Sequence, residues 1–443
     1  METRMMKKKK FEKESRRRRG SPNNIPKEII EEILSRLPAI TLARLKTACK
    51  QWLSLISHPS FAQLRHSRNP ATTSGFFVHA HNKQTDQHYI LKTTSPNRGP
   101  LIHLLTINKV KNTWTGYTRT EHINGLVLVT SNVFAYVVNP TTRQVFNLPF
   151  PQPATAAPNN VNVETQIICR RYNFFGFDQS QNQHKILHMR LLRSAASDVI
   201  TAEFEVFSLS DYSWRKLDNP TTLPADPINI VLVAPGLKNS VCVNSVIHMM
   251  LPHELKKILT FDLITECFSV IDLLVDLPPK PYTRYHSVQG HILRDTIPLL
   301  TQINNDGGLL LGLVCHDRLV ETNDMDIWIL QDHENRGVWA KKTITLSADK
   351  LIGEEGPLPW DYCDKYNKIV FSCQRMLSKK KRVSKKKMKK DVIIGVPVYD
   401  LKHERFKSLN FVIGDDHPFL HPKNVFIEFK SYIETIYPLN HNI

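Results

Sequence analysis

The N-terminal part of the chain carries two apolar stripes with helical spacing. Between residues 24 and 38, apolar side chains recur at steps of three to five, which predicts one face of an amphipathic helix. Pro26 suits the first helical turn, and Pro38 ends the helix. A second, narrower stripe ends at Ser57-His58-Pro59. The two stripes consist of Ile25, Ile29, Ile30, Ile33, Leu34 and Leu37, and of Leu42, Leu45, Cys49, Trp52 and Ile56.

Two helices of this size cannot bury all of these side chains against each other. Part of the apolar surface therefore requires either the rest of the chain or a partner.

From about Phe76 onward the pattern changes to short β-branched and aromatic runs separated by turn residues. No long helical period interrupts them, so this region predicts an all-β body of about twenty short strands. The clearest runs are Leu126–Val129, Val133–Val138, Glu203–Leu209, Ser240–Met250, Lys257–Leu263, Ile327–Leu330, Lys368–Ser372 and Val392–Tyr399.

A degenerate repeat of strand, polar turn and strand runs through this body. Each copy predicts an antiparallel hairpin with an aromatic side chain on the returning strand. One hairpin cannot bury its face alone, so several must stack, as the blades of a propeller do. The copies are Tyr136–Phe146, Phe204–Trp214, Leu259–Phe268, Val396–Phe406 and, more loosely, Asp326–Trp339.

The composition is that of a folded protein. The 443 residues are 41% hydrophobic and 23% charged, which excludes a mostly disordered chain. The longest near-continuous apolar runs, Ile228–Leu237 and Gly307–Cys315, are far shorter than a membrane span. The seven cysteines contain no Cys-x-x-Cys pair, and the N-terminus has no apolar signal region. We therefore expect an intracellular protein of the nucleus, the cytoplasm or both.

The net charge of +18 is concentrated in two short tracts. Residues 1–19 and 379–390 carry sixteen of the eighteen net positive charges, so the rest of the chain is nearly neutral. This distribution argues against specific nucleic-acid binding by the fold itself. The tracts resemble a two-part and a one-part nuclear import signal, which would bind an import receptor; solvated charge runs without a receptor are the alternative. The candidate import residues are Lys7, Lys8, Lys9, Lys10, Arg16, Arg17, Arg18, Arg19, Lys379, Lys380, Lys381 and Arg382.

Common catalytic and metal-binding spacings are missing. The sequence has no nucleophile elbow, phosphate-binding loop or dinucleotide fingerprint. His79 and His81 share one strand face, but no third ligand lies nearby in the sequence, so we expect no metal site and no cofactor. Asp361, Cys363 and Asp364 can be drawn as a small site beside Trp360, but a turn that leads into the strand at Lys368–Phe371 explains them as well.

Residues 24–66 resemble an F-box, through Asn24–Pro38, Leu42–Trp52 and Ser54–Phe61. Four residues depart from the family patterns. Within the F-box, Ile25 stands where leucine is usual, and Ala48 stands where valine is common and is expected to leave a small void. Within the β body, Ser245 follows Asn244 where glycine is usual and is strained if that hairpin needs a positive φ, and Met249 replaces an expected aromatic residue. The β body resembles the F-box-associated interaction domain (FBA, type 3) of plant F-box proteins. The matching stretches are Asn124–Leu126, Asn139–Arg143, Phe175–Asp178, Glu205–Lys216, Val241–His248, Phe261–Leu263 and Asp326–Leu330.

This resemblance implies an α+β multidomain fold, with a small helical F-box before a large all-β, propeller-like F-box-associated domain. Residues 1–20 are expected to be a disordered basic tail, residues 21–66 the F-box and residues 67–440 the β-repeat domain. The basic segment 378–391 is expected to be an inserted loop in that domain.

The resemblance also implies a function, that of the substrate-recognition subunit of an SCF-type (cullin–RING) ubiquitin ligase. The F-box would bind a Skp-type adaptor, the β domain would bind a protein substrate for ubiquitination, and the chain itself would be non-catalytic. A non-ligase or degenerate F-box interaction protein is the alternative. The implied adaptor-binding residues, which can equally form a helical core, are Ile25, Pro26, Ile29, Ile33, Leu34, Leu37, Pro38, Leu42, Leu45, Cys49 and Trp52.

The substrate and the residues that bind it are not identifiable from the sequence. Binding residues in β scaffolds lie mostly on loops, and the candidate loops are Gln152–Asn160 and Asn219–Asn229. Both segments can also be plain linkers.

Overall fold

The computed structural model divides the chain into two compact units, residues 1–72 and 73–443. In its described part, no helix is long and apolar enough to cross a membrane. The described residues are 25–68, 74–82, 84–93, 98–108, 118–151, 166–194, 200–217, 240–250, 257–273, 298–305, 308–319, 322–331, 338–346, 359–363, 368–371, 375–384, 387–401, 403–413 and 425–439.

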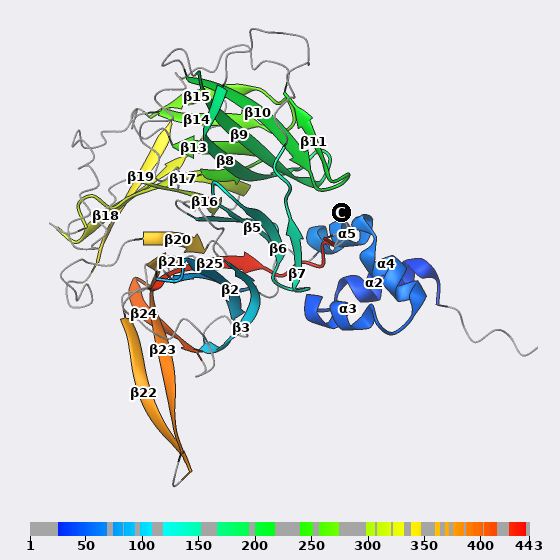
Figure 1. The fold of residues 1–443 in the computed structure, drawn as a ribbon, viewed down its shortest axis with the longest axis vertical. Helices are drawn as coiled ribbons and strands as arrows, with labels where there is room; N and C mark the ends of the chain where they lie inside the picture. Colours follow the sequence, from blue (N-terminus) through cyan, green and yellow to red (C-terminus); the bar gives the residue numbers. More distant parts are fainter. Residues whose placement is uncertain are drawn as a thin grey trace, which may run out of the picture. The chain divides into compact units, whose positions relative to one another are not determined.

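The first unit is built from short helices whose starts are set by proline (Figure 1). Pro26 and Pro38 occupy the N-cap positions, with ψ of 144° and 145°, and Pro59 is the first residue of its helix. Because proline cannot continue a preceding helix but fits the start of a new one, these residues fix the boundaries. The helices are α2 (Lys27–Ser35), α3 (Ala39–Leu45), α4 (Lys50–Ser57) and α5 (Pro59–Arg68).

The second apolar stripe is divided between α3 and α4. The chain turns at Thr47, whose hydroxyl donates to the carbonyl oxygen of Arg44 at 2.8 Å. Cys49 is extended, and its Sγ accepts a hydrogen bond from the N–H of Trp52 at 3.4 Å, which caps α4. Local bonds of this kind compete with helix continuation. Ala48 is exposed in this turn, so the expected void inside the helical unit is wrong.

The core of the helical unit is small. Arg65 on α5 donates from Nε to the carbonyl oxygen of Leu37 at 3.3 Å and ties α5 to the end of α2. Each fully buried aliphatic side chain contributes about 1.5–3 kcal/mol. The buried apolar residues of this unit are Leu34, Ala39, Leu42, Leu55, Ile56 and Phe61.

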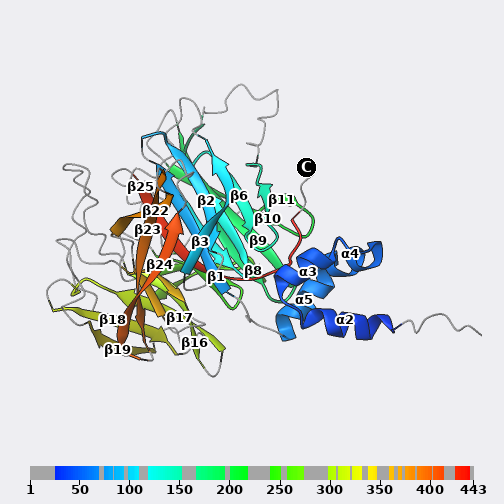
Figure 2. The same ribbon diagram turned by 90° about the horizontal axis from the view of Figure 1, so that it is seen from below.

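The second unit is all β in its described part (Figures 1 and 2). Four antiparallel sheets contain four strands each, consecutive in sequence and paired in order. Their strands are β4 (Arg119–Ile123), β5 (Leu126–Thr130), β6 (Ala135–Asn139) and β7 (Gln144–Asn147); β8 (Gln166–Asp178), β9 (Gln183–Ser194), β10 (Ile200–Ser208) and β11 (Ser213–Lys216); β12 (Ser240–Val243), β13 (Val246–Met250), β14 (Lys257–Asp262) and β15 (Phe268–Asp272); and β16 (Leu299–Asn305), β17 (Gly308–Cys315), β18 (Asp324–Leu330) and β19 (Trp339–Thr345).

A nine-stranded sheet combines the two ends of this unit. Its order is β20-β21-β23-β24-β3-β2-β1-β25, with β22 paired to β23. Only the short β24–β3 contact is parallel among these pairs, and it joins two antiparallel groups of strands. The strands are β1 (Ser74–Asn82), β2 (Gln87–Thr93), β3 (Arg98–Ile107), β20 (Pro359–Cys363), β21 (Lys368–Phe371), β22 (Arg375–Ser384), β23 (Lys387–Asp400), β24 (Arg405–Ile413) and β25 (Val425–Ile433).

The first strands of five successive groups form a closed ring together with the last strand, β25. Strand β4 neighbours β8, β8 neighbours β12, β12 neighbours β16, β16 neighbours β20, β20 neighbours β25, and β25 returns to β4. The predicted propeller-like all-β fold is thereby confirmed. The ring closes because β25, from the C-terminal end, pairs along its whole length with β1, from Ser74 opposite Ile433 to Asn82 opposite Val425.

The five predicted repeats are the outer hairpins of this fold. They correspond to β6–β7, β10–β11, β14–β15, β18–β19 and β23–β24. In four of these turns, a residue with left-handed φ lies four positions after the first turn residue: Arg143, Tyr212, Glu266 and Glu404, with φ of 62°, 54°, 57° and 49°. Asn139 shows the stabilising bond, because its Oδ1 accepts from the N–H of Thr141 at 3.0 Å. Ser245 also has a left-handed φ, of 67°, which bears out the expected strain of serine at this position.

The expectation of an inserted loop at 378–391 is wrong for its described part. This segment lies in the hairpin of β22 and β23, whose register runs from Arg375 opposite Gly395 to Ser384 opposite Lys387. The ladder continues outward from the apolar part of β23, although it places Lys380 opposite Lys390. Like charges at directly opposite positions are unfavourable. The sequence favours a loop here because the lysine block interrupts the pattern of β-forming residues.

Gly125 occupies a position that no larger residue fits. Its φ is +85°, and a Cβ there would lie 2.5 Å from the carbonyl oxygen of Ile433 and 2.6 Å from Cβ of Thr435. We expect Gly125→Ala to lower the free energy of unfolding by about 2–5 kcal/mol, from backbone strain plus overpacking. Gly308 is the control, because its φ is +128° but no atom lies within 4 Å of the added Cβ. Urea unfolding of both variants measures the difference; equal losses would contradict the close contact.

A buried histidine makes the β unit sensitive to acid. His188 on β9 is fully buried, its Nδ1 lies 2.7 Å from Oδ1 of Asn173, and burial together with Arg190 and Arg171 lowers its pKa to about 3. An unfolded histidine takes up its proton near pH 6.5, so the unfolded state binds more protons below that pH. We expect stability to fall by about 1.4 kcal/mol per pH unit from this residue between pH 6 and 4.

Unfolding midpoints at pH 7, 6 and 5 measure this slope. His188→Gln should reduce it by about one proton, whereas the exposed His103→Gln should leave it unchanged. An unaltered slope in the His188 variant would show that other groups cause the acid sensitivity.

Candidate functional site

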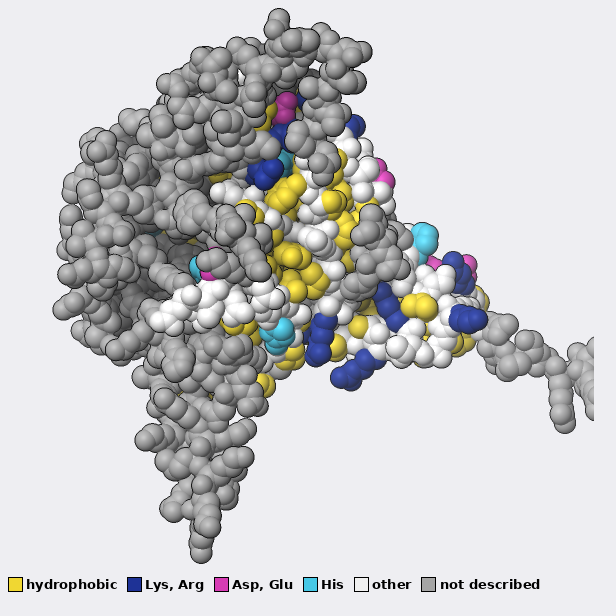
Figure 3. All heavy atoms as spheres, viewed as in Figure 1, with side chains coloured by type: hydrophobic (Ala, Val, Ile, Leu, Met, Phe, Trp, Pro, Cys, Tyr) yellow, Lys and Arg dark blue, Asp and Glu magenta, His cyan; other side chains and the backbone are white. Residues whose placement is uncertain are grey.

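The helical unit exposes large apolar side chains. Ile25, Ile29 and Ile33 are 51%, 48% and 51% exposed. Ile29 and Ile33 are spaced by four and lie along one face of α2, and Ile25 directly precedes its N-cap residue Pro26. Ile40 on α3 and Leu53 on α4 are also exposed. Figure 3 shows hydrophobic side chains reaching the surface of this unit, and we call these five residues the exposed apolar set.

The rest of the α2 surface is charged. Lys27 and Glu31 form an ion pair at 3.5 Å, and Arg36 donates to Glu32 at 2.7 Å, both one helical turn apart. Exposed pairs of this kind contribute only a few tenths of a kcal/mol each, but they keep the helix soluble. Uncovered apolar positions on an otherwise charged helix indicate a surface for a partner.

The structure divides the eleven candidate adaptor-binding residues into three groups. Leu34 and Leu42 are in the core of the helical unit and do not reach its surface. Leu37, Leu45 and Trp52 are half-buried, so each has a packed side and an accessible side. The accessible members are Ile25, Pro26, Ile29, Ile33, Pro38 and Cys49.

The sequence analysis did not include Ile40 and Leu53. Both fall between the stripe positions, and the apolar period predicts only the stripe residues as contact residues. The burial of Ala39 and Leu42 on α3 turns Ile40 outward, and the burial of Leu55 and Ile56 on α4 leaves Leu53 exposed. An apolar residue that breaks the helical period of a short helix was the signal that could have identified them.

The other candidates from the sequence are only partly described. The loops 152–160 and 219–229 and the basic tract 1–19 lie outside the described residues. The tract 379–382 lies in β22, paired with β23, and its role in nuclear import stays a prediction. Asp361 and Cys363 belong to β20 rather than to a turn, and Asp364 is outside the described residues.

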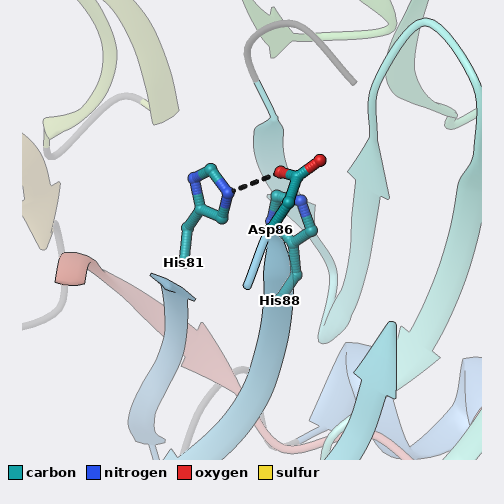
Figure 4. A group of neighbouring side chains, drawn as sticks. All are labelled: His81, Asp86 and His88. Carbon is teal, nitrogen blue, oxygen red and sulfur yellow. Dashed lines mark hydrogen bonds and ion pairs between the residues drawn. The ribbon is translucent and has the colours of Figure 1, made fainter. Parts of the chain in front are cut away.

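One cluster of ligand-type side chains was missed by the sequence analysis. The expectation that no third ligand lies near His79 and His81 is wrong, because strand pairing places His88 opposite His81 and the turn returns Asp86 beside them (Figure 4). Burial, with the nearby His79 and His81, lowers the pKa of His88 to about 2. Within the described ranges, no other group of three His, Cys, Asp or Glu residues is close enough to share an ion.

Comparison with known proteins matches both units. A family model described as "F-box domain" matches residues 22–64, and one described as "F-box associated beta propeller domain" matches residues 72–417. A putative F-box protein of Arabidopsis thaliana is 24% identical over 346 residues, which cover 75% of each chain. F-box protein CPR1 of the same plant is 24% identical over 354 residues, or 74% of each chain. A putative F-box/kelch-repeat protein of this plant is 25% identical over 399 residues, 88% of this chain and 89% of its own.

The second family model alone covers well over half of the chain, and the first coincides with the helices that carry the exposed apolar set. This chain therefore belongs to the family of F-box proteins that carry an F-box associated beta propeller domain.

Proposed function

We propose that this protein is the substrate-recognition subunit of an SCF-type cullin–RING ubiquitin ligase. Its helical unit binds a Skp-type adaptor, and its β unit binds the protein that is to be ubiquitinated. The family match supports this role in general, since the chain combines an F-box domain with an F-box associated domain.

The observation that carries the proposal is the exposed apolar set. Ile29 and Ile33 on one face of α2, and Ile25 just before this helix, are about half exposed in a unit whose own core contains other residues. An interface of this kind concentrates its binding energy in a few apolar anchors that are buried only in the complex. The adaptor would therefore cover Ile25, Ile29 and Ile33.

In this role the chain performs no bond chemistry. It raises the effective concentration of a substrate near the ubiquitin-loaded enzyme, because one unit holds the ligase and the other holds the target. A protein that binds the adaptor outside any ligase is the alternative. Cullin recruitment distinguishes the two, because only a ligase subunit brings the cullin into the captured complex.

Truncation of the exposed apolar set should abolish adaptor capture without unfolding the helices. We expect Ile29→Ala/Ile33→Ala to weaken binding of a Skp-type adaptor by at least about 30-fold, or roughly 2 kcal/mol, since both side chains are exposed in the free chain. Co-purification and titration of the full chain with the adaptor measure the loss.

The matched control is Ile264→Ala, which removes a similarly exposed isoleucine from the β unit. It should leave adaptor binding unchanged. If the double variant keeps wild-type affinity, or if the control loses as much, the assigned surface is wrong.

Leu42→Ala should remove adaptor binding by a different route. Leu42 is fully buried on α3, so its truncation leaves a cavity and costs about 2–5 kcal/mol of folding free energy. We expect loss of protection from proteolysis within residues 25–68, together with loss of adaptor capture. Limited proteolysis separates this variant from Ile29→Ala/Ile33→Ala, which should stay protected. An intact helical unit in Leu42→Ala would contradict the core assignment.

A further inference from the structure

The β1–β2 hairpin brings three metal-ligand types together in the β unit. Register pairs His81 on β1 with His88 on β2, so both imidazoles extend from the same face of the sheet. Asp86 lies in the turn between them with a left-handed φ of 51°. The turn is held by Asn82, whose Oδ1 accepts from the N–H of Gln84 at 3.0 Å. Figure 4 shows the His81 ring and the Asp86 carboxylate directed toward each other beside His88.

The donor atoms already lie near the spacing that a metal ion requires. Nε2 of His81 is 2.9 Å from Oδ1 of Asp86, and one donor atom from each of the three residues lies within 4.8 Å of the others. Bonds of about 2.0–2.2 Å to an ion place its ligand atoms roughly 3–3.5 Å apart. The His81 and His88 rings are stacked in nearly parallel planes, with centroids 4.1 Å apart. A shared ion therefore requires the His81 ring, which is the more accessible one, to tilt.

A second observation concerns the orientation of His88. Its Nδ1 lies 3.1 Å from Nε2 of His79, and Nδ1 of His79 lies 3.5 Å from a carboxylate oxygen of Glu428. The carboxylate favours a proton on Nδ1 of His79, which leaves Nε2 of His79 to accept from Nδ1 of His88. Nε2 of His88 then carries a bare lone pair. This atom is buried in a residue that is 1% exposed, and it has no hydrogen-bond partner.

A second histidine and a carboxylate behind His88 form the kind of arrangement that orients metal-binding histidines. A ligating imidazole usually passes its other N–H to a carboxylate or a similar acceptor, which fixes the tautomer and the ring orientation. Here Nδ1 of His88 is hydrogen-bonded to His79, and the Glu428 carboxylate faces the other nitrogen of His79 at 3.5 Å without a hydrogen bond. An unpartnered lone pair in the interior is otherwise a destabilising feature, and an ion would satisfy it.

We propose that His81, Asp86 and His88 form a binding site for a divalent transition-metal ion of the zinc class. Two imidazole nitrogens and one carboxylate oxygen suit this class, and water can complete the coordination because His81 and Asp86 are 21% and 20% exposed. On binding, the ion takes the place of the hydrogen bond between His81 and Asp86. The neutral His81 imidazole then carries its single proton on Nδ1 and binds the ion through Nε2.

The ion would stabilise the closure of the ring. The ligands lie on β1 and β2, Glu428 lies on β25, and the hydroxyl of Thr118, next to β4, lies 3.3 Å from Nδ1 of His88. The site therefore connects the hairpin with the C-terminal strand and with the start of the following sheet. Its role is structural, and it is independent of adaptor binding.

Zinc titration of the full chain tests this site. The chain is purified without a polyhistidine tag, and a chelator first removes any bound metal. We expect the chain to bind one zinc ion, as measured by competition with a chromophoric chelator. We also expect the Tm of the chain to rise when zinc is added. His81→Asn and Asp86→Asn should each weaken binding at least about tenfold and remove the rise in Tm. Asparagine tolerates the left-handed φ at position 86, and His88 is left unchanged because it is a core residue.

The matched control is His403→Asn. Nδ1 of His403 lies 3.0 Å from Oδ1 of Asp400, so this pair has the same chemistry without a third ligand among the described residues. The control should keep full zinc affinity. The proposal is overturned if the wild-type chain binds no zinc more tightly than the Asp86→Asn chain, or if His403→Asn loses as much affinity as the ligand variants.

Discussion

The pairing of the last strand with the first is the interaction on which the β unit depends. Without closure, β1 would leave an exposed strand edge, and its pairing with β25 covers that edge with backbone hydrogen bonds. Here β25 supplies the closing strand, and the segment after it is held as well. Nδ2 of Asn139 donates to the carbonyl oxygens of Thr435 and Tyr437 at 3.2 and 2.8 Å, and the turn at Gly125 packs against Ile433. Two of the three turns of the β4–β7 sheet, those at Gly125 and after Asn139, thus meet the C-terminal segment.

Much of the fold could be predicted because its signals are local. The hairpins were visible as strand, polar turn and strand, since the turn chemistry of Asn139 or Asp262 lies within a few residues of the strands that it joins. The closing pair was not visible, because β1 and β25 share no turn. The division between α3 and α4 was also missed, because it depends on the capping bond of Cys49 rather than on the apolar period.

The candidate site was predicted in part for a similar reason. Helical spacing identified Ile25, Ile29 and Ile33 as one face, but it could not separate contact residues from core residues, since both are apolar. Packing of α2 against α5 and of α3 against α4 made Leu34 and Leu42 core residues and left the isoleucines exposed. The His81 cluster was missed because His88 and Asp86 become neighbours only through strand register and a left-handed turn. No periodicity in the sequence reports either feature.

The ring closure has a consequence for synthesis of the chain on the ribosome. Strand β1 ends at Asn82, and its partner β25 begins at Val425, so about 340 residues are translated before the pair can form. At roughly 5–20 residues per second, β1 waits with one unpaired edge for about 20–70 s. During that interval the nascent β unit presents a template for wrong strand pairing, and chaperone protection of this edge would matter more than its stability in the finished protein.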